Sequence, residues 1–446
     1  MEEDSRDILT PLFSRPHIQK QFEYLENTVK EAQKRVDYTI AHDPDIIKAI
    51  EVVERFLRKN KRICYGGQAI NALLPKERQF YDTNYNIPDY DFFSPNPDAD
   101  VENLIDDLEA EGYTDVKKKL GVHEGTMKIY VNFVPIADIS AMNPAFFRTL
   151  QKRAKVVDGI FYCDADFLKM MMYLELSRPR GEVSRWKKVY ERLLLLNEAY
   201  PMRDCHEEIQ TVPISHEDRR IILKYCIKHK NVIVSPEIIQ LYEKQESKTH
   251  LNELVKEGGP VILFSSKAAS DADDLKYILS HDEGGIRIVE AITPADQIFN
   301  FVSIKRNGVP IALIFQEDAC HSYNILRLGG GDELRIATPD LFLHLYYGLA
   351  IFGKREKEFF ETSLECLIDK LNTILKHTRS KPTEFTPAFG LRCSGKQKGI
   401  ATLLREKVRR TQLEREKTKK INKNKSRGSG SGSGSSRNTA KRNRRT

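Results

Sequence analysis

A glycine pair followed by two closely spaced carboxylates is the feature that most constrains the fold of this chain. Residues 65–71 read YGGQAIN, and residues 87–93 read IPDYDFF. In a strand, alternate side chains share one face, so Asp89 and Asp91 should project together, with Cα atoms about 7 Å apart. That spacing suits carboxylates that hold two divalent cations about 3.5 to 4 Å apart, which can activate a hydroxyl and neutralise a leaving pyrophosphate. The pattern predicts phosphoryl transfer.

The triplet Asp-x-Asp is not distinctive by itself, because it occurs at 43/45, 89/91, 98/100, 164/166 and 271/273. Four of these have Ala or Pro between the acids and lie at predicted helix starts, where Asp caps free N–H groups. Only the triplet at 89/91 lies in an apolar, aromatic run that predicts a strand. Two charges there are costly unless they are paired or bound to metal. We therefore favour metal ligands over solvated acids on an edge strand.

Asp138 is a candidate third ligand. It interrupts the apolar run of residues 133–140, FVPIADIS, and the preceding residues 125–131 alternate as a strand does. Residues 123–140 thus predict a hairpin that ends at Asp138. Neighbouring strands lie about 4.8 Å apart, close enough to share metals. Alone, Asp138 would more often be an ordinary acid at a strand end, but the glycines and acids upstream favour the ligand.

The glycine pair itself follows a predicted short strand at 62–65 and opens a predicted helix at 68–74. Without side chains, Gly66 and Gly67 let backbone N–H groups approach a phosphate, and the helix N-terminus adds favourable partial charge. A lone Gly-Gly is usually only a turn. The carboxylate strand that follows makes phosphate binding the stronger interpretation.

Together these motifs resemble the nucleotidyltransferase superfamily of polymerase-β type, which has Gly-Gly at a first strand–helix junction, Asp-x-Asp on the next strand and a single Asp on a later one. The motif sequences YGGxAxN, PDYDFFS and VPIADIS resemble those of the poly(A) polymerase catalytic subunit of large cytoplasmic DNA viruses, the poxvirus and giant-virus group. The similarity of motifs covers about 62–180. One departure is the long interval between Gly67 and Asp89, which makes 76–86 an insertion near the nucleotide.

The resemblance implies a catalytic role for each acid. Asp89 and Asp91 would bind both metals, Mg²⁺ or Mn²⁺, and Asp138 would bind the metal that activates an RNA 3′-hydroxyl. The reaction would be template-independent addition of AMP from ATP to RNA 3′ ends.

The resemblance also implies a set of residues around the nucleotide. They are Gly66 and Gly67 on the triphosphate, Gln68 and Asn71 nearby, and Lys169 as a triphosphate ligand one turn into the predicted helix 164–174. The sequence does not show which side chains select the base.

Two alternatives to this function stay open. One is another RNA nucleotidyltransferase, which adds CCA or uridylates, and the other is an inactive scaffold that binds RNA. Expected partners are the RNA 3′ end, ATP, and either a second copy of the chain or a viral processivity subunit. The resemblance implies the host cytoplasm, at the viral factory, and the virion as a further location.

Composition agrees with a large enzyme outside the secretory route. The 446 residues suffice for two or three domains with ample core. The seven cysteines are scattered, odd in number and lack a C-x-x-C pair, which predicts free thiols in a reducing compartment. No apolar leader or run of about 18 apolar residues is present, so we expect no association with membranes.

Positive charge is concentrated at the C-terminus. Residues 394–446 carry 18 Lys or Arg and 3 Glu, a net charge of +15. Since the whole chain carries +7, residues 1–393 carry −8. The end of the chain alternates Gly with Ser and then becomes basic, a composition that predicts a disordered tail. Such a tail could hold RNA through phosphate contacts, or serve only for solubility, targeting or linkage.

Hydrophobic periodicity predicts several helices and one strand around the motifs. Two amphipathic helices, 18–37 and 44–59, should brace the catalytic sheet, the second through Ile46, Ile47, Ile50, Val53, Phe56 and Leu57. Residues 155–162 predict a strand, and 164–174 a helix capped by Asp164. Residues 182–245 are predicted to be helical, with Trp186 and Tyr190 as anchors.

A second, degenerate copy of the catalytic unit is also predicted. The run VPIA at 134–137 recurs at 309–312, and a helix start (Asp166, Asp340) follows 32 and 31 residues after each Val. Upstream, Phe-Ser and Asp-Ala-Asp at 93–100 match 264–273. In this alignment Asp89, Asp91 and Asp138 correspond to Pro260, Ile262 and Leu313, so the copy should bind no catalytic metal.

The predicted fold class is α+β, a nucleotidyltransferase catalytic domain of polymerase-β type with a degenerate second domain. The predicted boundaries are a helical N-terminal region at 1–60, the catalytic domain at 61–180, a helical connector at 181–249, the degenerate domain at 250–392 and the basic tail at 393–446.

Overall fold

The computed structural model describes residues 15–121, 125–202, 204–256, 258–280, 286–291 (backbone only), 300–353 and 361–399, and part of 401–412. The chain divides into a large unit, which holds all the sheets and helices discussed here, and a second unit of 122–124 and 398–446. Most of the predicted tail lies outside the described residues. None of the described helices is long and apolar enough to cross a bilayer.

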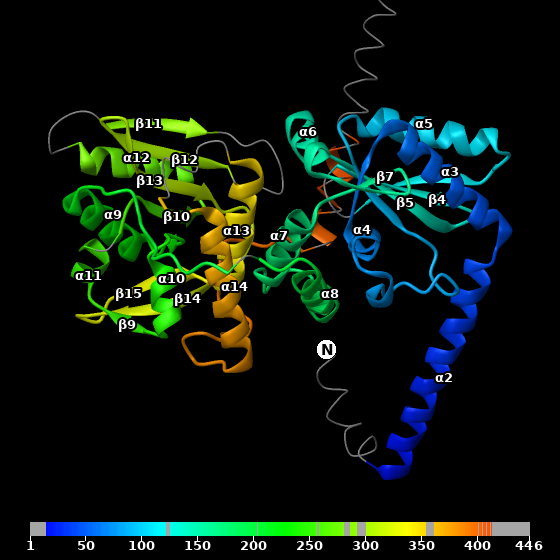
Figure 1. The fold of residues 1–446 in the computed structure, drawn as a ribbon, viewed down its shortest axis with the longest axis horizontal. Helices are drawn as coiled ribbons and strands as arrows, with labels where there is room; N and C mark the ends of the chain where they lie inside the picture. Colours follow the sequence, from blue (N-terminus) through cyan, green and yellow to red (C-terminus); the bar gives the residue numbers. More distant parts are fainter. Residues whose placement is uncertain are drawn as a thin grey trace, which may run out of the picture. The chain divides into compact units, whose positions relative to one another are not determined.

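The first sheet has seven strands in the order β3-β4-β5-β2-β1-β7-β6. Figure 1 shows this sheet with its helices in blue to teal. Its elements are α3 (Pro44–Asn60), β1 (Ile63–Tyr65), α4 (Gly66–Leu73), β2 (Tyr90–Ser94), α5 (Pro97–Ala110), β3 (Val116–Leu120), β4 (Thr126–Val131), β5 (Val134–Ala141), α6 (Pro144–Arg153), β6 (Lys155–Val157), β7 (Ile160–Tyr162) and α7 (Ala165–Leu176). Helices α3 and α5 pack on one face of the sheet. The other face carries the predicted carboxylates, and α7 covers part of it where Phe167 packs on Phe93.

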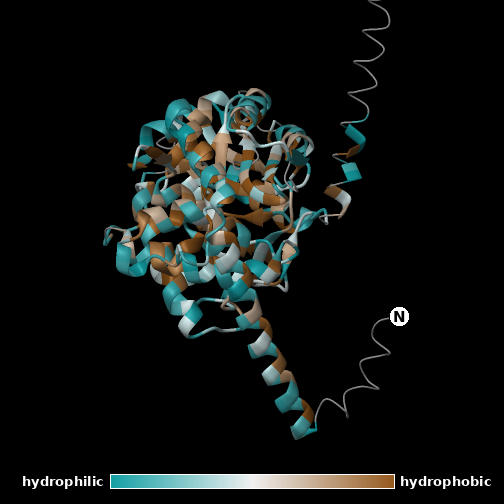
Figure 2. Ribbon diagram, turned by 90° about the vertical axis from the view of Figure 1, so that its right-hand side faces the viewer, coloured by the Kyte–Doolittle hydropathy of each residue, from teal (hydrophilic) through white to brown (hydrophobic). Residues whose placement is uncertain are grey.

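Of the two predicted N-terminal helices, only the second packs against the sheet. Helix α3 is capped by Asp43, whose side chain accepts the N–H of Asp45, and it buries most of its predicted face against the sheet. Ile47 is an exception, since it is 43% exposed. Helix α2 (Pro16–Ala41) buries only Ala41, so the prediction that it braces the sheet is wrong. Figures 1 and 2 show α2 extending away from the sheet.

Two predicted elements after the carboxylate strands are confirmed with changes. The residues 155–162 form two short strands, β6 and β7, because Asp158 and Gly159 turn with positive φ values of 50° and 78°. Helix α7 begins as predicted, and Asp164 accepts the N–H of Phe167 at 3.0 Å.

A connector and a second sheet follow. The elements are η2 (Val183–Arg185), α8 (Trp186–Ala199), α9 (His216–His229), β8 (Val232–Ile233), α10 (Ile238–Lys244), β9 (Lys248–Thr249), α11 (Leu251–Lys256), β10 (Val261–Ser265), α12 (Ala268–Leu279), β11 (Ile286–Ala291), β12 (Phe301–Arg306), β13 (Val309–Gln316), β14 (His321–Leu328), β15 (Glu333–Ala337), α13 (Pro339–Phe352), α14 (Leu364–Ser380) and β16 (Cys393–Ser394). The segment 182–245 is therefore not wholly helical, since it holds β8.

The two sheets share one topology. The second runs β11-β12-β13-β10-β8-β15-β14-β16, and each of its first seven strands pairs with its neighbour in the same direction as in the first sheet. Helices α9 and α12 cover it as α3 and α5 cover the first. We name residues 44–176 the first repeat and 216–352 the second repeat. The predicted copy is thus present in the fold, and it begins upstream of 250.

A serine–aspartate pair ties strand to helix in both repeats. Ser94 donates to the buried Asp100 at 2.5 Å, and Ser265 donates to the buried Asp271 at 2.6 Å. In the first repeat Arg62 also donates a hydrogen bond to the acid, and in the second repeat Asn231 does so. Asp100 therefore corresponds to Asp271, which corrects the predicted alignment by two residues.

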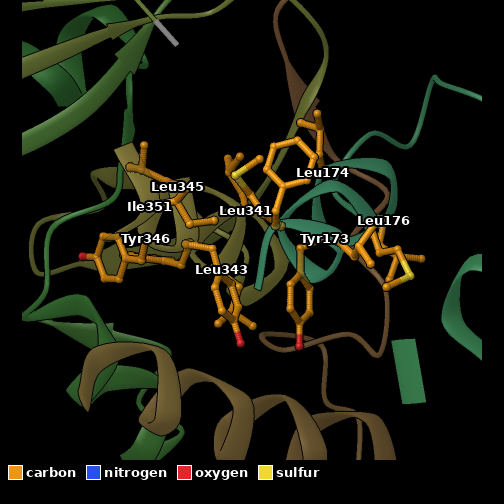
Figure 3. Close-up of a cluster of buried hydrophobic side chains, with 14 of the residues drawn as sticks. Tyr173, Leu174, Leu176, Leu341, Leu343, Leu345, Tyr346 and Ile351 are labelled. Atoms are coloured by element: carbon orange, nitrogen blue, oxygen red, sulfur yellow. The ribbon is translucent and has the colours of Figure 1, made fainter. Parts of the chain in front are cut away.

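The two repeats join through the equivalent helices α7 and α13. Figure 3 shows buried side chains of both helices meeting, among them Tyr173 and Leu343. Leu341, Leu343, Leu345 and Tyr346 are all at most 2% exposed, as predicted. The imidazole Nδ1 of His344 lies 3.0 Å from the carbonyl oxygen of Met170.

The cysteine prediction is wrong for four of the seven residues. Cys205 is bonded to Cys366, and Cys320 to Cys393. Cys64, Cys163 and Cys226 are buried free thiols. The bonded pairs lie 161 and 73 residues apart, so spacing gave no sign of them.

The serine–aspartate pair predicts a large stability difference between two neighbouring acids. Asp271→Ala would leave the buried Ser265 and Asn231 without their acceptor, and we expect the free energy of unfolding to fall by at least about 1–3 kcal/mol. Asp273→Ala, at an exposed position on the same helix, should stay within about 0.5 kcal/mol of wild type. Urea unfolding of both variants checks this, and equal losses would contradict it.

Candidate active site

The carboxylates Asp91 and Asp138 lie side by side on the face of the first sheet opposite α3 and α5. Strands β2 and β5 are parallel, and their register pairs Asp91 with Asp138. Paired residues on neighbouring strands point to the same side. Asp89 lies one residue before β2, and Tyr90 between the two acids is buried and donates to Glu54 at 2.8 Å. The structure therefore brings the three predicted acids together.

Burial and nearby negative charge disfavour ionisation of Asp89 and Asp91. Burial first, then the charges of Asp89 and Asp138, raise the pKa of Asp91 from 3.8 to about 7. The pKa of Asp89 is raised for the same reasons, although its exposed side chain is partly screened by solvent. Lys128 on β4 lies opposite Asp138 and donates to its Oδ2. Burial lowers the pKa of Lys128, but the ion pair with Asp138 and the other two acids raise it overall.

One oxygen of the site lacks a partner. Asp138 is 7% exposed, and its Oδ1 makes no hydrogen bond within the described part of the chain. A buried carboxylate oxygen without a donor is costly, and a divalent cation is the ligand that would satisfy it. The three acids do not form a closed cluster, because among the described residues only Cys205, Glu207 and Cys366 bring three ligand atoms within 4.8 Å of one another. Two of those three are disulfide-bonded, so the acids remain the better candidates.

The backbone of the glycine turn lies very close to the carboxylate of Asp91. Gly66 has φ +72°, and a Cβ there would lie 2.5 Å from Asp91 Oδ2. At Gly67, a Cβ would overlap the Tyr81 hydroxyl and lie 2.9 Å from Arg192 Nη1. Gly66 therefore requires glycine, whereas a side chain at Gly67 would have to displace the ends of Tyr81 and Arg192. The turn opens α4 directly after β1, as predicted, and Gly66 brings the start of this helix next to Asp91.

Two predicted nucleotide contacts have structural partners instead. Asn71 is buried, and its Oδ1 accepts the N–H groups of Phe80 and Tyr81 at 2.8 and 3.1 Å, so it anchors the insertion. Lys169 is 1% exposed and donates to the Tyr200 carbonyl at 2.5 Å. Burial lowers the pKa of this amine to about 8. Lys169 therefore does not reach the open site. Gln68 lies partly exposed in the first turn of α4.

Arg192 is the main site residue that the sequence analysis missed. It comes from α8, donates to the Tyr81 hydroxyl at 3.0 Å and lies 4.7 Å from the centre of the Phe80 ring. The insertion 76–86 thus holds a guanidinium beside the glycine turn. No local signal links Arg192 to Gly67, because 125 residues separate them.

Arg192 belongs to a row of cations at helical spacing, with Arg185 and Lys188. Partial burial, followed by repulsion from Arg192 and Arg185, lowers the pKa of Lys188. Arg185 and Lys188 act electrostatically on Asp91 and Asp89, so the row borders the acids. Cations held together in this way favour a polyanionic ligand. Their spacing at i, i+3 and i+7 is the signal that could have identified them.

The raised pKa of Asp91 predicts a pH-dependent gain in stability for Asp91→Asn. Below about pH 4 Asp91 is protonated in both the folded and the unfolded state, so the charge has no effect; between pH 4 and 7 the folded state becomes penalised, and above pH 7 the penalty is complete. Without divalent cations, we expect the variant to gain about 1–3 kcal/mol at pH 8, after allowance for solvent screening, and little at pH 4.

Thermal unfolding with and without Mg²⁺ measures this effect. Mg²⁺ should stabilise wild type more than the variant, because a bound cation needs the carboxylate. Asp98→Asn, at an exposed position, is the control. A variant that matches wild type at pH 8 in chelator would contradict the prediction.

Comparison with known proteins shows what the segment around these residues resembles. Residues 51–182 match the family model described as "Poly(A) polymerase catalytic subunit". A protein of Acanthamoeba polyphaga mimivirus described as a poly(A) polymerase catalytic subunit is 26% identical over 298 residues. This match covers 66% of the chain and 46% of the relative. The corresponding protein of African swine fever virus (strain Badajoz 1971 Vero-adapted) is 35% identical over 181 residues, 38% of this chain and 36% of the relative.

The fold is also shared with a solved structure. The crystal structure of the Megavirus polyadenylate synthase superposes with a TM-score of 0.72 at 20% identity, and the match covers 91% of this chain and 84% of that one. The sequence matches, by contrast, span less than half the length of either curated relative. The predicted resemblance to viral poly(A) polymerase catalytic subunits is confirmed for residues 51–182, the segment that holds the glycine turn and all three carboxylates.

Proposed function

We propose that this chain is a polynucleotide adenylyltransferase that adds AMP from ATP to RNA 3′ ends without a template. The observation that carries the proposal is the register of β2 and β5, which sets Asp91 beside Asp138 and next to the Gly66-Gly67 turn. This is the arrangement that two-metal phosphoryl transfer requires. The match of residues 51–182 to the poly(A) polymerase family supports adenylate addition in particular.

The acids fit divalent cations, and the proposal gives the pair at 89 and 91 one role and Asp138 another. Asp89 and Asp91 would hold both cations, and Asp138 would hold the one beside the RNA 3′-hydroxyl. The unpartnered Oδ1 of Asp138 supports this assignment. Bound Mg²⁺ or Mn²⁺ would supply a hydroxyl of lowered pKa and neutralise the charge that develops on pyrophosphate. Lys128 would hold the Asp138 carboxylate in its orientation.

The triphosphate would lie between the glycine turn and α8. Backbone N–H groups at the start of α4 offer donors, and Arg192 and Lys188 offer positive charge from the opposite side. Gln68 would lie close to the phosphates. Asn71 would act indirectly, because it fixes the insertion that positions Arg192.

The proposed partners follow from the same assignment. RNA and ATP would be the substrates. Since the curated relatives are described as catalytic subunits, we include a further viral subunit or a second copy of this chain as a partner. The host cytoplasm would be the site of action.

Extension of an oligo(A) primer with each nucleoside triphosphate separately tests the function. With Mg²⁺ or Mn²⁺, ATP should be incorporated far better than UTP, CTP or GTP. Asp89→Ala and Asp91→Ala should each abolish extension, because loss of a metal ligand removes transition-state stabilisation, while binding of labelled RNA persists. Comparable use of UTP or CTP would favour the alternative nucleotidyltransferases. Absence of extension by wild type with every nucleotide would favour the inactive scaffold.

The contact of Arg192 with the glycine turn predicts a nucleotide-binding defect. Arg192→Ala should raise the KM for ATP by about 10-fold or more, which corresponds to removal of one charged hydrogen bond of about 1.5–3 kcal/mol. The KM for the RNA primer should change little. Lys187→Ala removes an exposed cation from the same helix and is the matched control. If both variants keep the wild-type KM for ATP, the triphosphate lies elsewhere.

A further inference from the structure

A line of polar side chains crosses the face of the first sheet opposite α3 and α5 and continues beyond the acids. The register pairs Asp91 with Asp138, Asp138 with Lys128, and Lys128 with Lys119. Each pair is on neighbouring strands, so all four side chains point to the same face. Two strand spacings of about 4.8 Å separate Lys119 from Asp138, a distance of about 10 Å. The acids are thus continuous with a basic sheet edge.

Aromatic rings alternate with the lysines along this edge. The Lys119 amine lies 4.5 Å from the centre of the Tyr130 ring, and the Lys117 amine lies 4.3 Å from the centre of the Phe133 ring. Phe133 is 76% exposed and sits at the β4–β5 turn with φ +67°. A large apolar ring held in solvent by a strained backbone has a cost in folding. We name Lys117, Lys119, Tyr130 and Phe133 the β3–β4 track.

The opposite face of the same strand has a different role. Lys118 points to the covered side, where it pairs with Glu102 of α5. Lys117 contacts Asp115 at 2.6 Å, a neighbour in its own segment, and this exposed pair is weak. Lys119 is exposed and faces the rings. The charges on the face that carries the acids are therefore available to a ligand.

We propose that the β3–β4 track binds the last nucleotides of single-stranded RNA and leads the 3′ end to Asp138. Lysines would contact phosphates, and bases would stack on Tyr130 and Phe133, the combination by which proteins hold single strands without reading sequence. The inference rests on the proposed function, since that function places the 3′-hydroxyl beside Asp138. It assigns the primer to this edge and leaves the triphosphate on the other side of the acids, at Gly67 and Arg192.

The first test measures affinity for RNA with the full chain. Binding of a short 5′-labelled oligo(A) is followed by fluorescence anisotropy over a range of salt concentrations. Lys117→Ala/Lys119→Ala should reduce the slope of log affinity against log salt by about 1.4, because each lysine–phosphate interaction contributes about 0.7. Tyr130→Ala should weaken binding about fivefold or more, and Tyr130→Phe, which keeps the ring, should restore it. Lys118→Ala should behave as wild type.

The second test measures catalysis. The track variants should raise the KM for the oligo(A) primer and leave the KM for ATP unchanged, whereas Arg192→Ala should show the reverse. An oligo(A) with a photoreactive 3′-terminal base should form crosslinks to the peptides that hold Tyr130 or Phe133. Thermal unfolding confirms that each variant is folded.

The outcomes separate this inference from the proposed function. If wild type extends no primer, the function fails, but anisotropy still decides whether the track binds RNA. If the double variant matches Lys118→Ala in affinity, salt slope and primer KM, the track is overturned while the function stands. Crosslinks confined to other peptides would also overturn it.

Discussion

The parallel pairing of β2 with β5 is the constraint on which the site depends. Parallel register places Asp91 and Asp138 at one level on one face, where burial and the charges of Asp89 and Asp138 raise the pKa of Asp91. Only Lys128, from the next strand, offsets this within the sheet. On the opposite face, α3 and α5 bury a continuous apolar layer beneath the acids. The burial of this layer offsets the unfavourable free energy of holding the acids together. The stability of that layer holds the carboxylates where their repulsion alone would separate them.

The second repeat shows the same frame without the charges. Strands β10 and β13 are parallel, and their register pairs Ile262 with Leu313, the positions that Asp91 and Asp138 occupy in the first repeat. Both are at most 2% exposed. The backbone therefore does not need the acids to fold. The serine–aspartate pair, unlike the carboxylates of the site, is present in both repeats. It therefore stabilises the fold that the two repeats share.

Local patterns predicted the parts of the site that depend on neighbours in sequence. Alternation placed Asp89 and Asp91 on one face, the glycines marked the start of α4, and Asp164 marked the start of α7. The repeated VPIA run at 134–137 and 309–312, with the Phe-Ser match upstream, predicted the second repeat. What failed depends on distant contacts. Arg192 reaches Gly67 only through the tertiary fold, Asn71 is diverted to the insertion, and Lys169 is buried under Tyr200.

The same distinction explains the errors in the fold. The apolar spacing of α2 is that of a helix that packs, but nothing in a single helix says what it packs against, and only Ala41 is buried. Strand β8 has two residues, too few for alternation to show. The disulfide between Cys205 and Cys366 joins the connector to α14 across 161 residues. Each of these features depends on contacts with residues far away in the sequence, and periodicity does not show which residues those are.

The packing of α7 against α13 has a thermodynamic consequence. The two helices hold equivalent positions in the two repeats, so their packing joins like surfaces, as an isologous dimer interface does. In a dimer, dilution would separate such surfaces. Within one chain the effective concentration of each repeat for the other is set by the connector and does not change with the amount of protein. The first sheet therefore keeps its apolar support at the lowest concentrations at which the chain is made.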